Sequence, residues 1–83
     1  MRTRYKGYGN KNVVGKTIES LRIANGMQQN EFIAKLQIAG LDIDDATYSK
    51  LEGQNRKACD KDIYIIAKVL KVPMEKLFEN SDL

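Results

Sequence analysis

The side chains of this sequence whose chemistry is easiest to interpret lie on one face of a short predicted helix. Tyr48 and Leu51 form the apolar repeat of this helix, which we place over residues 45–53. The opposite, outward face then carries small or polar side chains at three positions: Ala46, Ser49 and Lys50. Such side chains can come close to base edges in the major groove of DNA and exchange hydrogen bonds with them. The alternative for the same residues is an ordinary solvated face.

Two neighbouring groups of residues could hold phosphates beside that helix. Gln29 and Asn30 begin a predicted helix over residues 28–39, where exposed backbone N–H groups and an amide side chain favour an anion. The chain after residue 53 adds an amide and two cations: Asn55, Arg56 and Lys57. A solvent-exposed turn is the alternative for the two cations.

The positive charge of the chain is concentrated near its N-terminus. The net charge is +3, but residues 1–22 hold six Lys or Arg against one Glu, whereas residues 23–83 hold eight against ten Asp or Glu. Such asymmetry indicates a basic segment that is attracted to polyanions. We interpret residues 1–12 as a flexible basic arm, with a frayed and solvated terminus as the alternative. By analogy with basic arms of other DNA-binding proteins, three of its cations would enter the minor groove: Arg2, Arg4 and Lys6.

The composition argues against an enzyme and against a metal site. The 83 residues suffice for one small domain, and they include no His and a single Cys, Cys59. A structural zinc site needs about four Cys or His ligands, and a Ser or Cys nucleophile would lack an imidazole base. We therefore expect no catalytic residue, metal or cofactor. No apolar run reaches the about 18–20 residues of a membrane span and no signal-peptide core is present, so the expected compartment is the cytoplasm, without a membrane partner.

Five helices account for the sequence beyond the arm. Apolar residues at helical spacing place them at about 13–25, 28–39, 45–53, 60–71 and 73–79. Gly26 and Gly40 end the first two, because glycine readily takes the left-handed conformation that ends many helices. Asp44 caps the third helix, and Pro73 suits the first position of the fifth. The expected fold is an all-α, compact five-helix bundle over residues 13–83.

Three sequence elements within residues 13–79 occur in a characteristic order: QNEF at 29–32, SKLE at 49–52 and IAKVLKV at 66–72. In this order and spacing they resemble the Cro-type (Xre) helix-turn-helix family of phage repressors and bacterial regulators. The family implies a lambda-repressor-like domain whose third helix enters the major groove, usually as a homodimer on a two-fold DNA site. The resemblance therefore implies a transcriptional regulator, with repression as its expected action, that binds double-stranded DNA.

The resemblance also implies roles for individual residues. Four residues match base-reading positions or share their surface: Asp45, Ala46, Ser49 and Lys50. Two match positions that contact the DNA backbone or face a phosphate: Gln29 and Thr47. Arg22 and Glu52 match an internal ion pair that would fix the third helix against the first. Loss of one partner would strand a partly buried charge, at a cost of roughly 3 kcal/mol or more.

Three features depart from the family pattern. Segment 36–44 is longer than the family's tight turn, as in a variant branch with a lengthened second helix. The family's glycine after the third helix would fall at Gln54, whereas here the glycine is Gly53. Asp45 is an acid where relatives often have Arg, Gln or Ser. A carboxylate there could accept from the amino group of cytosine, but it otherwise repels phosphates.

A protein-interaction module on the same fold, such as an antitoxin or an adaptor, is the alternative function. Its sequence basis is an acidic cluster beside the predicted reading helix: Asp42, Asp44 and Asp45. Substitution of Ser49 and Lys50 discriminates between the two functions, because only a DNA reader would lose its preference for one DNA sequence. Attachment to a membrane surface is disfavoured, since residues 1–12 offer no apolar helical face.

Overall fold

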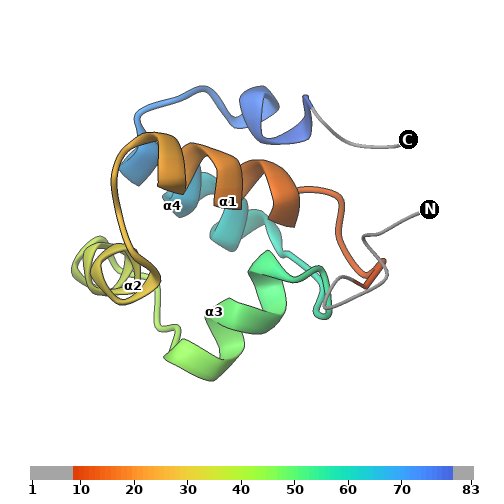
Figure 1. The fold of residues 1–83 in the computed structure, drawn as a ribbon, viewed down its shortest axis with the longest axis horizontal. Coiled ribbons are helices and arrows are strands. Elements are labelled where there is room, and N and C mark those ends of the chain that lie inside the picture. The colour runs from red at the N-terminus through yellow and green to blue at the C-terminus, as the bar shows by residue number, and fades with distance from the viewer. Residues whose placement is uncertain (1–8, 80–83) are drawn as a thin grey trace.

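Helices alone build the part of the chain that the structure, a computed structural model, describes: residues 9–79 (Figure 1). They are α1 (Gly15–Ala24), α2 (Gln29–Ile38), α3 (Asp45–Glu52), α4 (Asp60–Leu70) and the 3-10 helix η2 (Met74–Phe78). No strand occurs within these residues. The prediction of an all-α fold is confirmed, and the ends of the four α-helices differ from the predicted ones by no more than two residues.

The fifth predicted helix is a 3-10 helix and not an α-helix. Pro73 has an extended backbone (φ −67°, ψ 152°), so it lies before the first helical residue and not at that position. Only five residues follow, of which Leu77 is buried. Helical segments this short commonly close i to i+3 hydrogen bonds, as the Lys76 N–H does to the Pro73 carbonyl.

Local capping and two buried side chains fix where α3 begins. The Asp44 carboxylate accepts a hydrogen bond from the Thr47 N–H (Oδ1···N 2.7 Å), as predicted for an N-cap residue. Gly40 ends the preceding turn with φ at 107°, a conformation that favours glycine. Leu41 and Ile43 then enter the core. The connection between α2 and α3 is therefore anchored at both ends.

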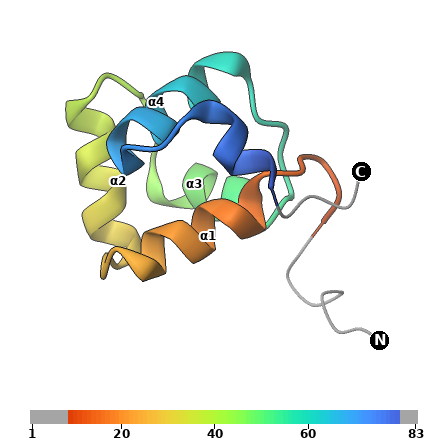
Figure 2. The same ribbon diagram turned by 90° about the horizontal axis from the view of Figure 1, so that it is seen from above.

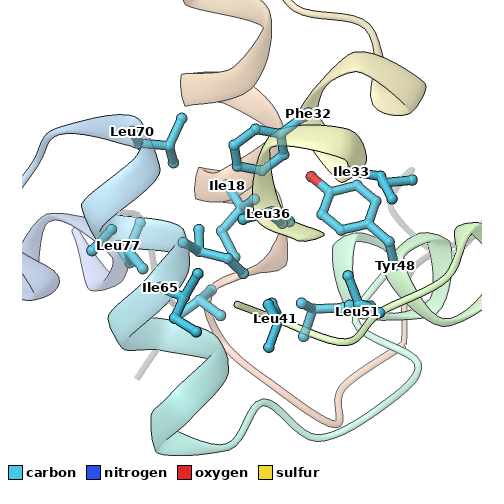
Figure 3. Close-up of a cluster of buried hydrophobic side chains, with 14 residues drawn as sticks. Ile18, Phe32, Ile33, Leu36, Leu41, Tyr48, Leu51, Ile65, Leu70 and Leu77 are labelled. Carbon is cyan, nitrogen blue, oxygen red and sulfur yellow. The ribbon is translucent and has the colours of Figure 1, made fainter. Parts of the chain in front are cut away.

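One apolar core lies between the helices (Figure 3). Its largest fully buried side chains come from α1, α2, α3, α4 and η2 and from the residue before α1: Val14, Ile18, Phe32, Leu36, Tyr48, Leu51, Ile66 and Leu77. The rings of Phe32 and Tyr48 meet edge to face, with their centroids 5.7 Å apart. This contact packs one side of α3 against α2 and leaves its opposite side outward.

The ends of the molecule are formed by segments that lie far apart in the sequence. Figures 1 and 2 both place α2 at one end and residues 9–14 at the other. In Figure 1, η2 and α3 lie on opposite sides of α1. The end that residues 9–14 form also contains the chain that leaves α3, shown in blue-green beside the orange-red segment in Figure 1.

Residues 9–12, which we predicted to belong to a flexible arm, are part of the folded domain. The N–H groups of Gly9 and Lys11 donate to the carbonyls of Gly53 and Gln54 at 2.8 and 2.9 Å. These carbonyls follow the end of α3, where the helix supplies no further partners. These hydrogen bonds join residues 9–12 to the chain that leaves α3, whereas residues 1–8 of the predicted arm lie outside the described residues.

Candidate nucleic-acid interface

Four exposed side chains form the outer face of α3: Asp45, Ala46, Ser49 and Lys50. They point outward as the apolar repeat predicts, because Tyr48 and Leu51 turn the opposite side of the helix into the core. Thr47 lies on α3 as well and is half-buried. The outer face therefore consists of three short or flexible polar side chains and the methyl group of Ala46.

The charge of the outer face changes sign along α3. Asp44 and Asp45 lie at its N-terminus, Lys50 lies in its last turn, and Asp42 is exposed shortly before the helix. A hydrogen bond with the Thr47 side chain lowers the pKa of the Asp44 carboxyl below its ordinary value. Ionised acids are favourable at this end of a helix because of the helix dipole. A passing polyanion would therefore meet repulsion at the start of α3 and attraction at its end.

A buried ion pair fixes α3 against α1. Arg22 Nε lies 2.8 Å from Glu52 Oε2, and Arg22 Nη2 lies 3.3 Å from Oε1. The two side chains are 8% and 4% exposed, so the pair is largely shielded from water. Arg22 also donates to the Met27 carbonyl at 2.7 Å, and its hydrogen bond to Glu52 raises the pKa of the guanidinium. The ion pair implied by the resemblance is thus present, and its role is structural.

Two more side chains converge on the Glu52 carboxylate. The Tyr48 hydroxyl donates to Oε2 at 2.7 Å, and Gln29 Nε2 donates to Oε1 at 2.8 Å. Burial, followed by the hydrogen bond to Glu52, raises the pKa of the Tyr48 phenol well above its ordinary range. Together with Arg22, these donors form what we call the Glu52 network. Because its members come from α1, α2 and α3, the network sets the orientation of α3.

Gln29 connects the Glu52 network to the outer face. While its Nε2 binds Glu52, its Oε1 accepts a hydrogen bond from the Ser49 hydroxyl at 3.3 Å. The structure therefore brings together Gln29 and Ser49, two residues that the sequence analysis assigned to different kinds of DNA contact. A phosphate contact from the Gln29 amide would have to share these side-chain partners. Gln29 is in any case a link between α2 and α3.

The cations after α3 differ in their surroundings. Asn55 and Lys57 are exposed, but Arg56 is half-buried and its Nη2 lies 3.9 Å from Oδ2 of the buried Asp62. The Asp62 carboxylate also accepts from the Cys59 N–H at the start of α4. The charge of Arg56 is therefore partly balanced within the domain, whereas none of the ion pairs found within residues 9–79 includes Lys57.

Asn12 is a residue of this region that the sequence analysis missed. Its Nδ2 donates to the carbonyls of Leu51 and Arg56 at 3.0 and 2.8 Å. Its Oδ1 accepts from the N–H groups of Val14 and Gly15, where α1 begins. The acceptor half of this role has a sequence signal, since Asn side chains often accept hydrogen bonds from backbone N–H groups two or three residues on. The half that reaches α3 has none, because its partners lie far along the chain.

Gln54 adopts the left-handed backbone conformation, with φ at 63°, while the preceding Gly53 has φ at −81°. For a residue other than glycine this conformation costs about 1–2 kcal/mol. The buried Gln54 amide offsets part of the cost by donating to the Asn12 carbonyl at 2.9 Å. The chain turns at the position where the resemblance places a glycine, and a side-chain hydrogen bond accompanies the turn.

Some predictions concern residues or properties outside this geometry. Arg2, Arg4 and Lys6 lie outside the described residues. None of the helices between residues 9 and 79 has the length and apolar character that crossing a membrane requires. Within the same residues, no three His, Cys, Asp or Glu side chains are grouped so that they could hold a metal ion.

Comparison with protein-family models, with curated proteins and with solved structures gives no match for this chain.

Proposed function

We propose that this protein is a sequence-specific DNA-binding transcriptional regulator of the Xre type, acting as a repressor in the cytoplasm. The observation that carries the proposal is the outer face of α3, which is exposed on a helix that is held rigidly from behind. The Glu52 network joins α3 to α1 and α2 through side chains that are mostly buried. A reading helix needs such rigidity, because a displaced donor or acceptor loses its discrimination between bases.

In this proposal, α3 lies in the major groove and its residues divide into two groups. Four side chains face base edges: Asp45, Ala46, Ser49 and Lys50. Asp45 would accept from the amino group of cytosine, and Lys50 would donate to guanine, as these residue types do in known readouts. The second group would set the register of the helix on the phosphates: Gln29, Thr47, Asn55, Arg56 and Lys57.

The electrostatic contribution would come mainly from the N-terminal residues. Residues 23–83 contain two more acids than bases, whereas Arg2, Arg4 and Lys6 bring three cations within the first six residues. Replacing all three with Gln in the full chain should lower the slope of log K against log salt by up to about three units. An unchanged slope would refute the role of the arm and leave that of α3 intact.

A homodimer on a two-fold DNA site belongs to the same proposal. One copy of a domain this small reads only a few base pairs, and pairing two copies doubles the site and its specificity. Sedimentation of the chain with and without bound DNA measures the number of copies directly.

Selection of bound duplexes from a random-sequence pool, at a stated salt concentration, is the primary test. A DNA reader should enrich one motif, and two-fold symmetry in that motif would indicate a dimer. Ser49→Ala and Lys50→Ala should each relax the motif at one or two positions, at about 1–3 kcal/mol per lost base contact. Lys35→Ala removes an exposed charge from α2 and serves as the control for Lys50→Ala. A pool without enrichment would refute the proposal.

The acidic N-terminus of α3 favours a second candidate function, a protein-interaction module such as an antitoxin or adaptor. Asp42, Asp44 and Asp45 are all exposed there and would repel a nucleic acid. For such a module, Ser49→Ala and Lys50→Ala would change neither the affinity for DNA nor any preference for a DNA sequence. A change of all three acids to Asn would abolish binding of a basic protein partner.

A further inference from the structure

We propose that Lys11 and Lys57 form an additional phosphate-binding site beside the C-terminal end of α3, and that Asn12 holds this site in position. The inference rests on the proposed DNA-binding function. It adds Lys11 to the DNA-contacting residues and gives Asn12 the role of a positioning residue.

The two lysines share one surface hollow, although they lie in opposite halves of the chain. Lys11 and Lys57 are both exposed, and both line a hollow of about 320 Å³. The rest of its lining is Asn12 and five apolar residues: Val13, Val14, Ala58, Ile63 and Phe78. No acid is present among these lining residues of the described chain. The two lysines therefore border a largely apolar hollow whose lining includes no carboxylate.

This placement results from hydrogen bonds that close the end of the molecule, a contact that we call the clasp. Lys11 N–H donates to the Gln54 carbonyl, while Asn12 Nδ2 donates to the carbonyls of Leu51 and Arg56. Asn12 therefore binds the last turn of α3 and the residue directly before Lys57. Through these contacts the position of Lys11 and the path of the chain at Lys57 depend on each other.

A phosphate group of a DNA backbone is the partner that this arrangement fits. Two cations at one surface repel each other, and an anion between them relieves the repulsion. Lysine binds phosphate as a flexible point charge, so it needs a fixed backbone more than it needs a fixed side chain. The clasp fixes the backbone at both lysines before binding, which reduces the ordering cost on contact. A duplex that accepts α3 in its groove would carry its backbone past this end of the helix.

The first experiment compares Lys11→Ala with Lys68→Ala in the full chain. Lys68 lies on the exposed side of α4, so its removal changes the net charge equally without touching the hollow. Anisotropy titration of a labelled random-sequence duplex gives the slope of log K against log salt. Lys11→Ala should lower this slope by about one unit, so that its Kd rises roughly 3.5-fold less than that of the wild type between about 50 and 200 mM salt. An unchanged slope, or an equal change in Lys68→Ala, would overturn the proposal.

The second experiment tests Asn12 as a positioning residue. Asn12→Asp keeps the acceptor that binds the N–H groups of Val14 and Gly15, but it loses the donor to the carbonyls around α3. Asn10→Asp adds the same charge at an exposed neighbour and serves as its control. Relative to this control, Asn12→Asp should lower the salt slope by about one unit. Adding Lys11→Ala should then lower it no further, whereas additive effects would overturn the positioning role.

If Asn12→Asp does not fold, Gly9→Ala replaces it, because a Cβ at residue 9 would collide with Asn55 and the Gln54 carbonyl and open the clasp.

Two readouts distinguish failure of the lysine site from failure of the proposed function. The selected DNA motif reports on α3, whereas the salt slope on a random duplex reports on the lysine site. Loss of the slope effect with an intact motif refutes only the lysine site. Absence of DNA binding by the wild type refutes both.

Discussion

The Tyr48 hydroxyl and the Glu52 carboxylate, one turn apart on α3, are joined by a buried hydrogen bond of 2.7 Å. Glu52 also receives Arg22 from α1 and Gln29 from α2. One carboxylate thus collects donors from three helices and determines how α3 is presented. The ring of Tyr48 packs on Phe32, so the same side chain contributes to the core and to the polar network.

Tyr48→Phe should lower the free energy of unfolding by about 1.5–3 kcal/mol, because the buried carboxylate loses one donor while the ring contact with Phe32 remains. Urea denaturation at neutral pH measures the change. Tyr64→Phe is the matched control, since Tyr64 is exposed on α4 and does not bind Glu52. Equal stability of the wild type and Tyr48→Phe would show that the hydroxyl does not support α3.

The same tyrosine predicts a dependence of stability on alkaline pH. The pKa of Tyr48 is raised in the folded state, so the unfolded chain releases this proton at a lower pH than the folded protein does. The contribution of the phenol to stability is therefore complete below the ordinary tyrosine pKa of about 10 and declines as the pH rises above it. The free energy of unfolding should fall more steeply above that pH in the wild type than in Tyr48→Phe. Parallel curves would contradict this linkage.

The Asp44 carboxyl should make the free energy of unfolding depend on acidic pH. Its folded-state pKa is lowered, so its contribution is present above the ordinary Asp pKa of about 3.9 and is lost as the pH falls through the folded value. Asp44→Asn keeps a good N-cap acceptor that does not titrate. This variant should be about as stable as the wild type at neutral pH and should lose less stability between neutral and strongly acidic pH. Asp42→Asn, at an exposed neighbour, controls for the change in net charge.

Gln29→Ala should weaken the connection between α2 and α3. Glu52 would lose the 2.8 Å hydrogen bond from Nε2, and Ser49 would lose its acceptor. We expect a loss of about 1–3 kcal/mol in the free energy of unfolding, since a buried carboxylate is left with fewer donors. Gln28→Ala, at the exposed neighbour, should change stability by less than about 0.5 kcal/mol. Equal effects of the two variants in thermal unfolding would count against the link.

Lys71→Gly should stabilise the protein. Lys71 ends α4 in the left-handed conformation with φ at 62°, and the Val72 N–H bonds to the Ala67 carbonyl in the pattern of a glycine-ended helix. Removing the Cβ relieves about 1–2 kcal/mol of backbone cost, less about 0.5–1 kcal/mol for the added freedom of the unfolded chain. Lys68→Gly, inside α4, should instead destabilise by about 1 kcal/mol. A loss of stability in Lys71→Gly would contradict the interpretation.

The parts of the structure that local rules govern could be predicted from the sequence. The apolar repeat at Tyr48 and Leu51 correctly predicted which side of α3 is buried, and Asp44 correctly predicted where the helix begins. Gly26 and Gly40 take the positive φ values expected at helix ends. In each case the decisive interaction joins residues within a few positions of each other, which is the range over which such patterns hold.

The parts that depend on contacts between distant segments could not be predicted. Residues 9–12 looked like a free arm because their composition is basic and glycine-containing, yet their partners are carbonyls around Leu51 and Arg56. The 3-10 type of η2 was not predicted either; the segment has only five residues, and helical segments this short commonly close i to i+3 hydrogen bonds.

The clasp also bears on how the protein acquires its surface during synthesis. The Asn12 side chain and its Arg56 partner are 44 positions apart, so the ribosome must release more than half of the domain before the two can meet. Until then, Lys11 belongs to a nascent chain without the neighbour that would complete its anion site. The corner that we propose for a phosphate contact is thus assembled only after α1, α2 and α3 have all left the ribosome.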